Sequence, residues 1–262
     1  MGGEVMPGGM VNAGAVVRHG GIVERPAPPH AAALHAHLRA LAAEGFDGVP
    51  VPLGVTASGR RERLSYVPGD VAVPPHPPWV WTDGALRSVG ALLRRMHSAA
   101  AGIPLDAAAG WSAELADPQG AGAAGALLCH NDVCLENVVF RDGRAAALID
   151  FDQAAPGRPL WDVAMTARYW VPMSGRDGLD RAHRLRLLAD GYGLGRADRA
   201  ALPGVIEEAT GVCRAFVERR VAGGDPVYAG ALEAGGGWGR WDRHQAWLAG
   251  HRDELAAALL AG

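Results

Sequence analysis

Hydrophobic residues near the N-terminus recur at the short spacing that is typical of strands. In the segment 15–26, two β-prone runs are joined by Gly20 and Gly21, a pair that suits a two-residue hairpin turn because glycine accepts a positive φ. Further short strands are expected over segments 49–55 (VPVPLGV) and 61–67 (RERLSYV). Between the hairpin and these strands, helical spacing of apolar residues predicts one helix that stops at Gly45; its core face is Leu34, Leu38 and Leu41.

A proline-rich stretch separates this region from a longer, helical one. Pro68 and Gly69 begin an interruption that extends through Pro78, and we place a boundary between two lobes there. Asp83 can then cap a helix, and from about residue 160 onward helical patterns alternate with glycine breaks. The pattern predicts an N-terminal lobe over residues 1–68 and a mainly helical lobe over residues 69–262.

The segment 129–152 carries amides and carboxylates among small and apolar residues. Its beginning, ALLCHN from residue 126, indicates a strand that enters a loop. The runs NVVF and AAALID, on either side of an Asp-Gly pair at 142–143, indicate a hairpin. The polar residues therefore cluster where strands end.

Composition narrows the possible function. The chain of 262 residues is 49% hydrophobic, so it can bury a core, and its net charge of -3 gives no reason to expect a nucleic-acid partner. It contains no lysine, which excludes Schiff-base chemistry and a Walker-type phosphate loop. Three cysteines without metal-ligand spacing fit a reducing compartment. No signal peptide and no run of about 18 apolar residues is present, so we expect a cytoplasmic protein without a membrane partner.

Four polar residues of the 129–152 segment have the spacing of kinase-type phosphotransferases. His130, Asp132 and Asn137 form H-x-D-x-x-x-x-N, and Asp150 follows in Ile-Asp-Phe-Asp. Phosphoryl transfer requires an aligned acceptor oxygen and a cation that neutralises charge on the phosphates. The pattern predicts Asp132 as the base and Asn137 with Asp150 as ligands of Mg²⁺.

Taken together, these motifs resemble the aminoglycoside phosphotransferase family, which includes choline-kinase-like enzymes and shares the protein-kinase-like fold. The resemblance covers nearly the whole chain and is carried by CHNDVCLENVVF, ALIDFD, LWDVA, LSYVPGD and LLRRMHSA. It implies an α+β fold of two lobes, with a small antiparallel sheet in the N-terminal lobe. It also implies that His130 and Asp162 support the loop, although Asp162 could equally be a helix N-cap. Asn131 replaces the usual glycine of the family's His-Gly-Asp.

The N-terminal lobe contains candidate nucleotide contacts. Residues 9–16 fit G-x-G-x-x-G-x-V except at the second glycine. In the predicted hairpin register Val16 pairs with Arg25, and alternation places Val16, Val23 and Arg25 on one face. Arg25 thus occupies the position of the kinase lysine and is predicted to bind phosphates. Backbone groups of the hinge-like segment are predicted to bind adenine: Ser65, Tyr66 and Val67.

Several features depart from the kinase pattern. Between Arg25 and Glu44 there is no acid, so the usual ion pair with a helical glutamate is expected to be absent. Cys134 lies where protein kinases often carry a lysine. Three histidines of the first helix are predicted to lie on the surface, because a spacing of two on a helix points side chains apart: His30, His35 and His37.

The predicted function is transfer of the terminal phosphoryl group of ATP or GTP to a hydroxyl of a small molecule, with Mg²⁺. Two alternatives are a nucleotide-binding pseudokinase and a metal-dependent phosphate-ester hydrolase that uses His130, Asp132, Asp150 and Asp152. The acceptor and the oligomeric state stay open. Aromatic and acidic residues of the helical lobe would suit a cationic acceptor, but such tryptophans are more often core residues: Trp170, Trp238, Trp241 and Trp247, with Glu207, Glu208, Glu218 and Asp242.

Overall fold

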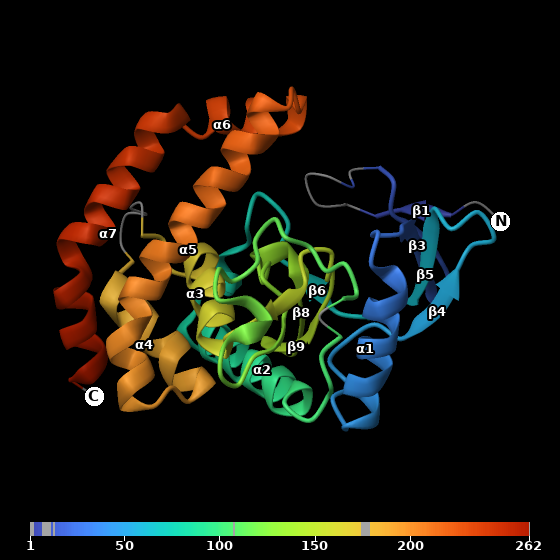
Figure 1. Cartoon of the computed structure of the whole chain (residues 1–262), viewed down its shortest axis with the longest axis horizontal. Helices are drawn as coiled ribbons and strands as arrows, with labels where there is room; N and C mark the ends of the chain where they lie inside the picture. The colour runs from blue at the N-terminus through green and yellow to red at the C-terminus, as the bar shows by residue number, and fades with distance from the viewer. Residues whose placement is uncertain (1–2, 7–11, 13, 107, 174–178, 262) are drawn as a thin grey trace.

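A computed structural model gives the fold of the chain (Figure 1). The structure describes residues 3–6, 12, 14–106, 108–173 and 179–261. Helices and antiparallel strands are both present, and the sheet of five strands lies at the N-terminal end of the molecule, as expected for a protein-kinase-like α+β fold. Within these described ranges, no helix is long and apolar enough to cross a membrane.

In the part of the chain that the structure describes, the strands form three separate antiparallel sheets. The first has the order β1-β2-β3-β5-β4, the second pairs β10 with β7, and the third has the order β6-β8-β9. All five strands of the first sheet precede residue 68. The strands are β1 (Glu4–Val5), β2 (Val17–His19), β3 (Ile22–Pro26), β4 (Pro52–Val55), β5 (Arg61–Ser65), β6 (Asp70–Val71), β7 (Leu127–Cys129), β8 (Val138–Arg141), β9 (Arg144–Leu148) and β10 (Ala155–Gly157).

The helices make up most of the chain after the proline-rich stretch. In Figure 1, α5 and α7 lie side by side at the end of the molecule opposite the five-stranded sheet, and α6 connects them. The helices are α1 (Ala31–Ala43), α2 (Asp83–Ala100), α3 (Pro159–Trp170), α4 (Arg181–Tyr192), α5 (Arg196–Ala222), α6 (Pro226–Ala234) and α7 (Gly237–Leu260), with short 3-10 helices η1 (Pro78–Trp81), η2 (Gly120–Gly122) and η3 (Leu135–Asn137).

The N-terminal hairpin has the predicted register. Arg18 lies opposite Val23 in the pairing of β2 with β3, and Gly20 in the turn has a φ of 61°. The same register places Val16, just before β2, toward Arg25. The second predicted hairpin is also present, because β8 pairs with β9 around a turn in which Asp142 and Gly143 both have positive φ. Two central residues with positive φ are what a type I′ turn requires.

Helix α1 corrects the prediction for its histidines. Its leucines are buried as predicted, and the helix is followed by Gly45 with a φ of 84°. However, His30, His35 and His37 are all buried, with 5%, 4% and 6% of their surfaces exposed. The spacing argument failed because α1 is covered on more than one side, so residues that point apart still meet protein.

Helices α2 and α4 approach each other closely at two glycines. A Cβ at Gly90 would lie 2.6 Å from the Leu188 carbonyl oxygen, and a Cβ at Gly191 would lie 2.2 Å from the Arg87 carbonyl oxygen. Since backbone atoms cannot move aside easily, only glycine allows this approach. The start of α2 differs from the prediction by one residue, because Thr82 rather than Asp83 caps the helix and accepts from the Ala85 amide.

Candidate active site

The loop that follows β7 is held in place by one carboxylate. Asp162 accepts hydrogen bonds from the backbone amides of His130 (2.7 Å) and Asn131 (2.8 Å). It lies within the first turn of α3, whose N-cap is Arg158, so the N-cap interpretation of Asp162 is wrong. Asn131 has a φ of 64°, a left-handed conformation that asparagine tolerates better than most residues, which explains how it replaces a glycine here.

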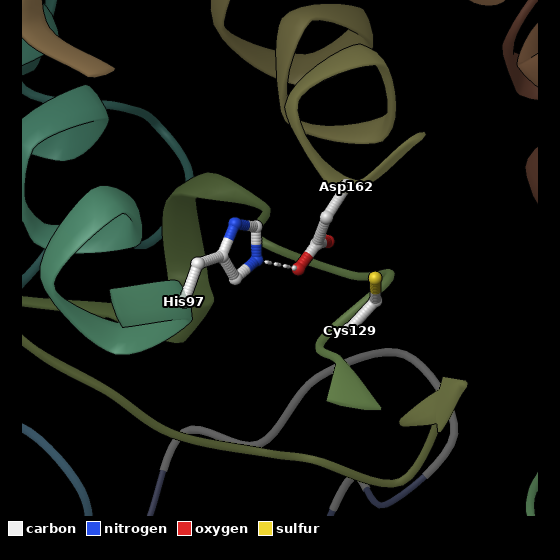
Figure 2. A group of neighbouring side chains, drawn as sticks. All are labelled: His97, Cys129 and Asp162. Atoms are coloured by element: carbon white, nitrogen blue, oxygen red, sulfur yellow. Dashed lines mark hydrogen bonds and ion pairs between the residues drawn. The ribbon is translucent and has the colours of Figure 1, made fainter. Parts of the chain in front are cut away.

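A second contact fixes Asp162 itself. Nε2 of His97, from α2, lies 3.0 Å from Asp162 Oδ2 (Figure 2). Nδ1 of His97 lies 2.7 Å from the Tyr192 hydroxyl. Burial would raise the pKa of Asp162, but hydrogen bonding and charge from His97, together with His130, hold it below its usual value. The carboxylate therefore stays ionised and braces the loop.

The same group has the composition of a metal site but not its chemistry. His97, Asp162 and Cys129 lie close together and are all buried (Figure 2). However, both oxygens of Asp162 already accept amide donors. Burial raises the pKa of the Cys129 thiol well above its usual value, so the thiolate that binds metals is not available. We interpret the group as structural.

The predicted base is held by two neighbours. Asn137 Nδ2 donates to the backbone oxygen of Asp132 (2.9 Å) and to its Oδ2 (3.2 Å), and the Tyr169 hydroxyl donates to Oδ1 (2.6 Å). Burial raises the pKa of Asp132, and the Asp150 charge adds to this, whereas the bond from Tyr169 opposes it. Sequence reasoning missed Tyr169, which lies in α3 far from the loop along the chain.

The two predicted metal ligands come from adjacent backbone segments. Asn137 ends η3 and immediately precedes β8, while Asp150 follows β9, the partner of β8. The Ile149 amide donates to the Asn137 carbonyl oxygen at 3.0 Å, so the two segments stay paired up to the residue before Asp150. Asp150 has a φ of 64°, which turns the chain away from the sheet at this point.

Arg25 connects the five-stranded sheet to this cluster. Its NH1 donates to Asp150 Oδ1 and its NH2 to Asp152 Oδ1, both at 2.6 Å. Its Nε donates to Glu62 Oε1 at 2.7 Å. Arg25 is 6% exposed, and burial would lower its pKa, but the charges of Asp150, Asp152 and Glu62 raise it. The guanidinium is therefore a buried, permanently charged group beside the predicted metal ligands.

Glu62 supplies the acid that sequence reasoning could not find. As predicted, no glutamate of α1 pairs with Arg25; the partner comes instead from β5, where Arg25 lies opposite Glu62. Glu62 is fully buried, and its second oxygen lies 2.6 Å from Nε2 of His35. Helix α1 thus contributes a histidine, and the strand contributes the acid. The signal available in the sequence was the alternation of buried positions in β5, which places Glu62 and Leu64 on one face.

The negative charge of the cluster favours a cation. Three carboxylates, from Glu62, Asp150 and Asp152, face the single guanidinium of Arg25. Burial raises the pKa of Asp152 to about 6, and the charges of Asp150 and Glu62 contribute to the increase. Because the Asn137 amide nitrogen is directed at Asp132, the amide oxygen of Asn137 remains available. Amide and carboxylate oxygens, such as those of Asn137 and Asp150, are the hard donors that Mg²⁺ prefers.

Of the residues that were predicted to contact the nucleotide, some already use their backbone amides in hydrogen bonds within the protein. The Ser65 amide donates to Val51 O and the Tyr66 amide to Gly21 O, so both amides are used within the sheet. Val67 is then the remaining residue of the predicted hinge. Val23 lies in β3 opposite Leu64 of β5. In the glycine motif 9–16, residues 9–11 and 13 lie outside the described part of the chain.

The acidic residues considered for a cationic acceptor are already paired with arginines. Ion pairs join Glu207 to Arg252 and Glu208 to Arg158, while Glu218 and Asp242 both contact Arg214. Trp170 is fully buried, and its Nε1 donates to the Val133 carbonyl oxygen, which supports the loop.

Comparison with known proteins identifies a family for the chain. Residues 105–202 match the model of the phosphotransferase enzyme family. The chain is 31% identical to the trifolitoxin immunity protein of Rhizobium leguminosarum bv. trifolii, over 93% of this chain and 94% of that protein.

Solved structures show the same fold. A choline/ethanolamine kinase family protein from Mesorhizobium loti superposes with a TM-score of 0.68 at 18% identity, covering 100% of this chain and 93% of that one. Aminoglycoside 2'-phosphotransferase-IIIa, in its GDP complex, gives a TM-score of 0.61 at 13% identity, covering 94% and 93%. The loop motifs, the fold and these similarities together show that the chain belongs to the phosphotransferase enzyme family typified by aminoglycoside phosphotransferases and choline-kinase-like enzymes.

Proposed function

We propose that the protein transfers the terminal phosphoryl group of ATP or GTP to a hydroxyl of a small molecule. The observation that carries the proposal is the grouping of Asp132, Asn137 and Asp150 at the ends of paired strands, beside a buried arginine. In this proposal the sheet of residues 1–68 binds the nucleotide, and the helical lobe of residues 69–262 carries the loop and the acceptor.

Asp132 is proposed to accept the proton of the attacking hydroxyl. A base must lie within hydrogen-bonding reach of that hydroxyl, and Tyr169 already occupies such a position on Oδ1. An acceptor hydroxyl would replace or share this bond. Asn137 holds the other oxygen, so the carboxylate cannot rotate freely.

Asn137 and Asp150 are proposed to hold Mg²⁺, which would neutralise charge on the phosphate oxygens. Arg25 is proposed to bind the phosphates through guanidinium donors that the carboxylates leave free. Because Glu62 fixes Nε, the fork of Arg25 keeps one orientation toward Asp150 and Asp152.

The structure weakens the argument for a pseudokinase. That alternative relied partly on the missing helical acid, and Glu62 supplies an equivalent ion pair. The hydrolase alternative required His130 as a functional ligand or acid. Instead, His130 Nε2 contacts the Ile149 carbonyl oxygen and Nδ1 accepts from the Asp132 amide, so both ring nitrogens support the loop.

The direct test is nucleotide turnover in the Asp132→Asn variant. With a mixture of candidate alcohols, wild type should release ADP or GDP and form a phosphate ester visible by phosphorus NMR. Loss of the base should reduce kcat by about 100-fold or more while nucleotide affinity is retained. Equal rates in wild type and variant would contradict the role of Asp132.

Asp142→Asn is the matched control. It makes the same chemical change in the exposed turn between β8 and β9, where asparagine tolerates the φ of 51°. Wild-type activity in this variant would show that the loss in Asp132→Asn is local to the loop.

The similarity to a trifolitoxin immunity protein favours a second proposal, which concerns the biological role: protection of a cell by phosphorylation of a toxic compound. A trifolitoxin-sensitive bacterium that expresses wild type should survive exposure to trifolitoxin, and the same strain with Asp132→Asn should not. Survival with both proteins would indicate protection by binding alone. Survival with neither would contradict the role for this toxin.

A further inference from the structure

A cavity in the helical lobe lies one side chain away from the predicted base. It has a volume of about 280 Å³, and its walls come from α3, α5, α6 and α7. Tyr169 is part of the wall, and its hydroxyl donates to Asp132 Oδ1 at 2.6 Å. A molecule in this cavity therefore needs only to pass or displace the Tyr169 hydroxyl to reach the base.

Most of the cavity wall is apolar. Met173, Val217, Leu232 and Trp241 contribute aliphatic and aromatic surface to it. Such a lining suits the hydrocarbon or aromatic part of a ligand, because burying apolar surface is favourable and no polar partner is needed there.

The charged side chains among the described residues of the wall are arginines. Arg168 and Arg240 line the cavity together with His244, and no Asp or Glu is present among the described residues that line it. Arg168 stacks on Tyr169, with its guanidinium carbon 5.2 Å from the ring centroid. Within the described ranges, no carboxylate forms an ion pair with Arg168, although the Asp132 charge contributes to raising its pKa.

The lowered pKa of His244 reflects its burial and the positive charge around the cavity. Burial, together with the charges of Arg168, Arg240 and Arg181, lowers the pKa of His244 to about 4. Its Nε2 is buried and has no hydrogen-bond partner among the described residues. The imidazole is therefore neutral near neutral pH, with one nitrogen left for a ligand and positive charges around it.

Acidic residues of the same helices lie next to wall residues in the chain but do not line the cavity. Glu218 and Asp242 are adjacent to Val217 and Trp241 and are both bound by Arg214, whereas Glu233 is adjacent to Leu232 and is exposed. A polyamine sugar would need several carboxylates to replace its hydration shell. The described wall offers none.

We propose that this cavity is the acceptor site and that it selects an apolar, mostly aromatic alcohol that is uncharged or anionic, and rejects polycations. The inference rests on the proposed phosphotransferase function in one respect only, namely that the hydroxyl of the bound alcohol receives the phosphoryl group. The charge preference is a property of the cavity and can be measured without nucleotide.

The test compares three probes with one aromatic scaffold and different charge: tryptophol, indole-3-propionate and tryptamine, with streptomycin as a polycation. Binding to the full chain without nucleotide is measured by ligand-observed NMR and calorimetry. The carboxylate and the alcohol should bind, and the carboxylate should bind about tenfold or more tightly than the amine. Tighter binding of tryptamine or streptomycin, or no binding of any probe, would overturn the proposal.

Two variants locate the effect. Arg168→Gln should weaken indole-3-propionate by about tenfold and leave tryptophol nearly unchanged, because only the charged pair is lost. Arg243→Gln, an exposed arginine of α7 outside the wall, should change neither. If Arg168→Gln and Arg243→Gln weaken the binding of indole-3-propionate and of tryptophol to the same extent, the role of Arg168 is contradicted.

If Arg168→Gln does not fold, Leu232→Trp should block all probes by filling the cavity, and retained binding would overturn the proposal.

The outcome for the acceptor site is separate from the outcome for catalysis. Retained charge selectivity in a protein that never releases ADP or GDP would contradict the proposed function and leave the cavity proposal intact. Turnover with streptomycin as the acceptor, by contrast, would support phosphoryl transfer and overturn the cavity proposal.

Discussion

Arg25 illustrates how the absence of one residue type changes a candidate active site. In a chain without lysine, the position that was predicted to match the kinase lysine carries a guanidinium. The fork can contact Glu62, Asp150 and Asp152 at once, which a single ammonium would do with poorer geometry. At this position, therefore, arginine links the sheet to the carboxylates of Asp150 and Asp152 as well as carrying charge.

Glu62→Gln tests the importance of this link. The substitution removes the negative charge that fixes Arg25, and it leaves a buried guanidinium with one partner fewer. We expect the free energy of unfolding to fall by about 3 to 5 kcal/mol, as for other broken buried ion pairs. We also expect the KM for nucleotide to rise about tenfold. Urea unfolding and steady-state kinetics measure the two effects.

Glu24→Gln is the control for this substitution. Glu24 precedes Arg25 in the same strand and pairs with Arg61 and Arg63 near the surface. It should leave both stability and the nucleotide KM close to wild type, since such exposed pairs contribute little. A Glu62→Gln variant that behaves like Glu24→Gln would contradict the positioning role of Glu62.

The candidate site residues that the sequence predicted lie in one motif, and the site residues that it missed lie outside that motif. Asp132, Asn137 and Asp150 lie within one short segment whose spacing carries the signal. Glu62 and Tyr169 reach the same site from a different strand and a helix. Strand alternation could have indicated that Glu62 shares a face with Leu64, but it does not name Arg25 as its partner. Only the packing of distant segments brings Glu62 and Tyr169 to the site.

Helix α1 is the element whose environment the sequence described least well. Its leucine face was predicted, because a repeat of apolar residues is visible in the letters. The burial of His35 and His37 was not, since polar residues on the second face become buried only when the sheet is in place. Strands and turns near Gly20 and Asp142 were predictable because their backbone requirements are local.

The buried histidine His37 makes stability depend on pH. Burial lowers its pKa to about 4, from an ordinary value of 6.5. Below pH 6.5 the unfolded chain binds a proton that the folded protein does not, so stability falls as the pH decreases from 6.5 to about 4. The full effect of such a shift is about 3 kcal/mol.

His37→Leu should therefore flatten the pH dependence of the unfolding free energy over this range. Urea unfolding at a series of pH values measures the slope. His19→Leu, which changes an exposed histidine of β2, should keep the wild-type slope. An unchanged slope in His37→Leu would show that this imidazole is accessible to protons in the folded protein.

At the scale of the whole molecule, the site lies where the five-stranded sheet meets the helical lobe. Arg25 comes from β3, Asp132 follows β7, and Asp150 follows β9. Asp162 of α3 and His97 of α2 hold the loop from the helical side. Three sheets and two helices thus converge on the position where the account places the terminal phosphate.

The division into lobes at residue 68 stays a prediction. The strands on either side of it belong to different sheets, since β5 pairs with β3 and β4 whereas β6 pairs with β8. Core side chains of α1 nevertheless join the same hydrophobic cluster as those of α2. The proposed nucleotide-binding lobe of residues 1–68 therefore shares its core with the helical lobe.

A crystal structure with Mg²⁺ and a non-hydrolysable ATP or GTP analogue tests the central claim most directly. The account predicts that Asn137 Oδ1 and an Asp150 carboxylate oxygen bind one Mg²⁺, with Arg25 on the phosphates and Asp132 facing the terminal phosphate without binding the ion. A nucleotide bound elsewhere, or an ion bound by only one of Asn137 and Asp150, would contradict it.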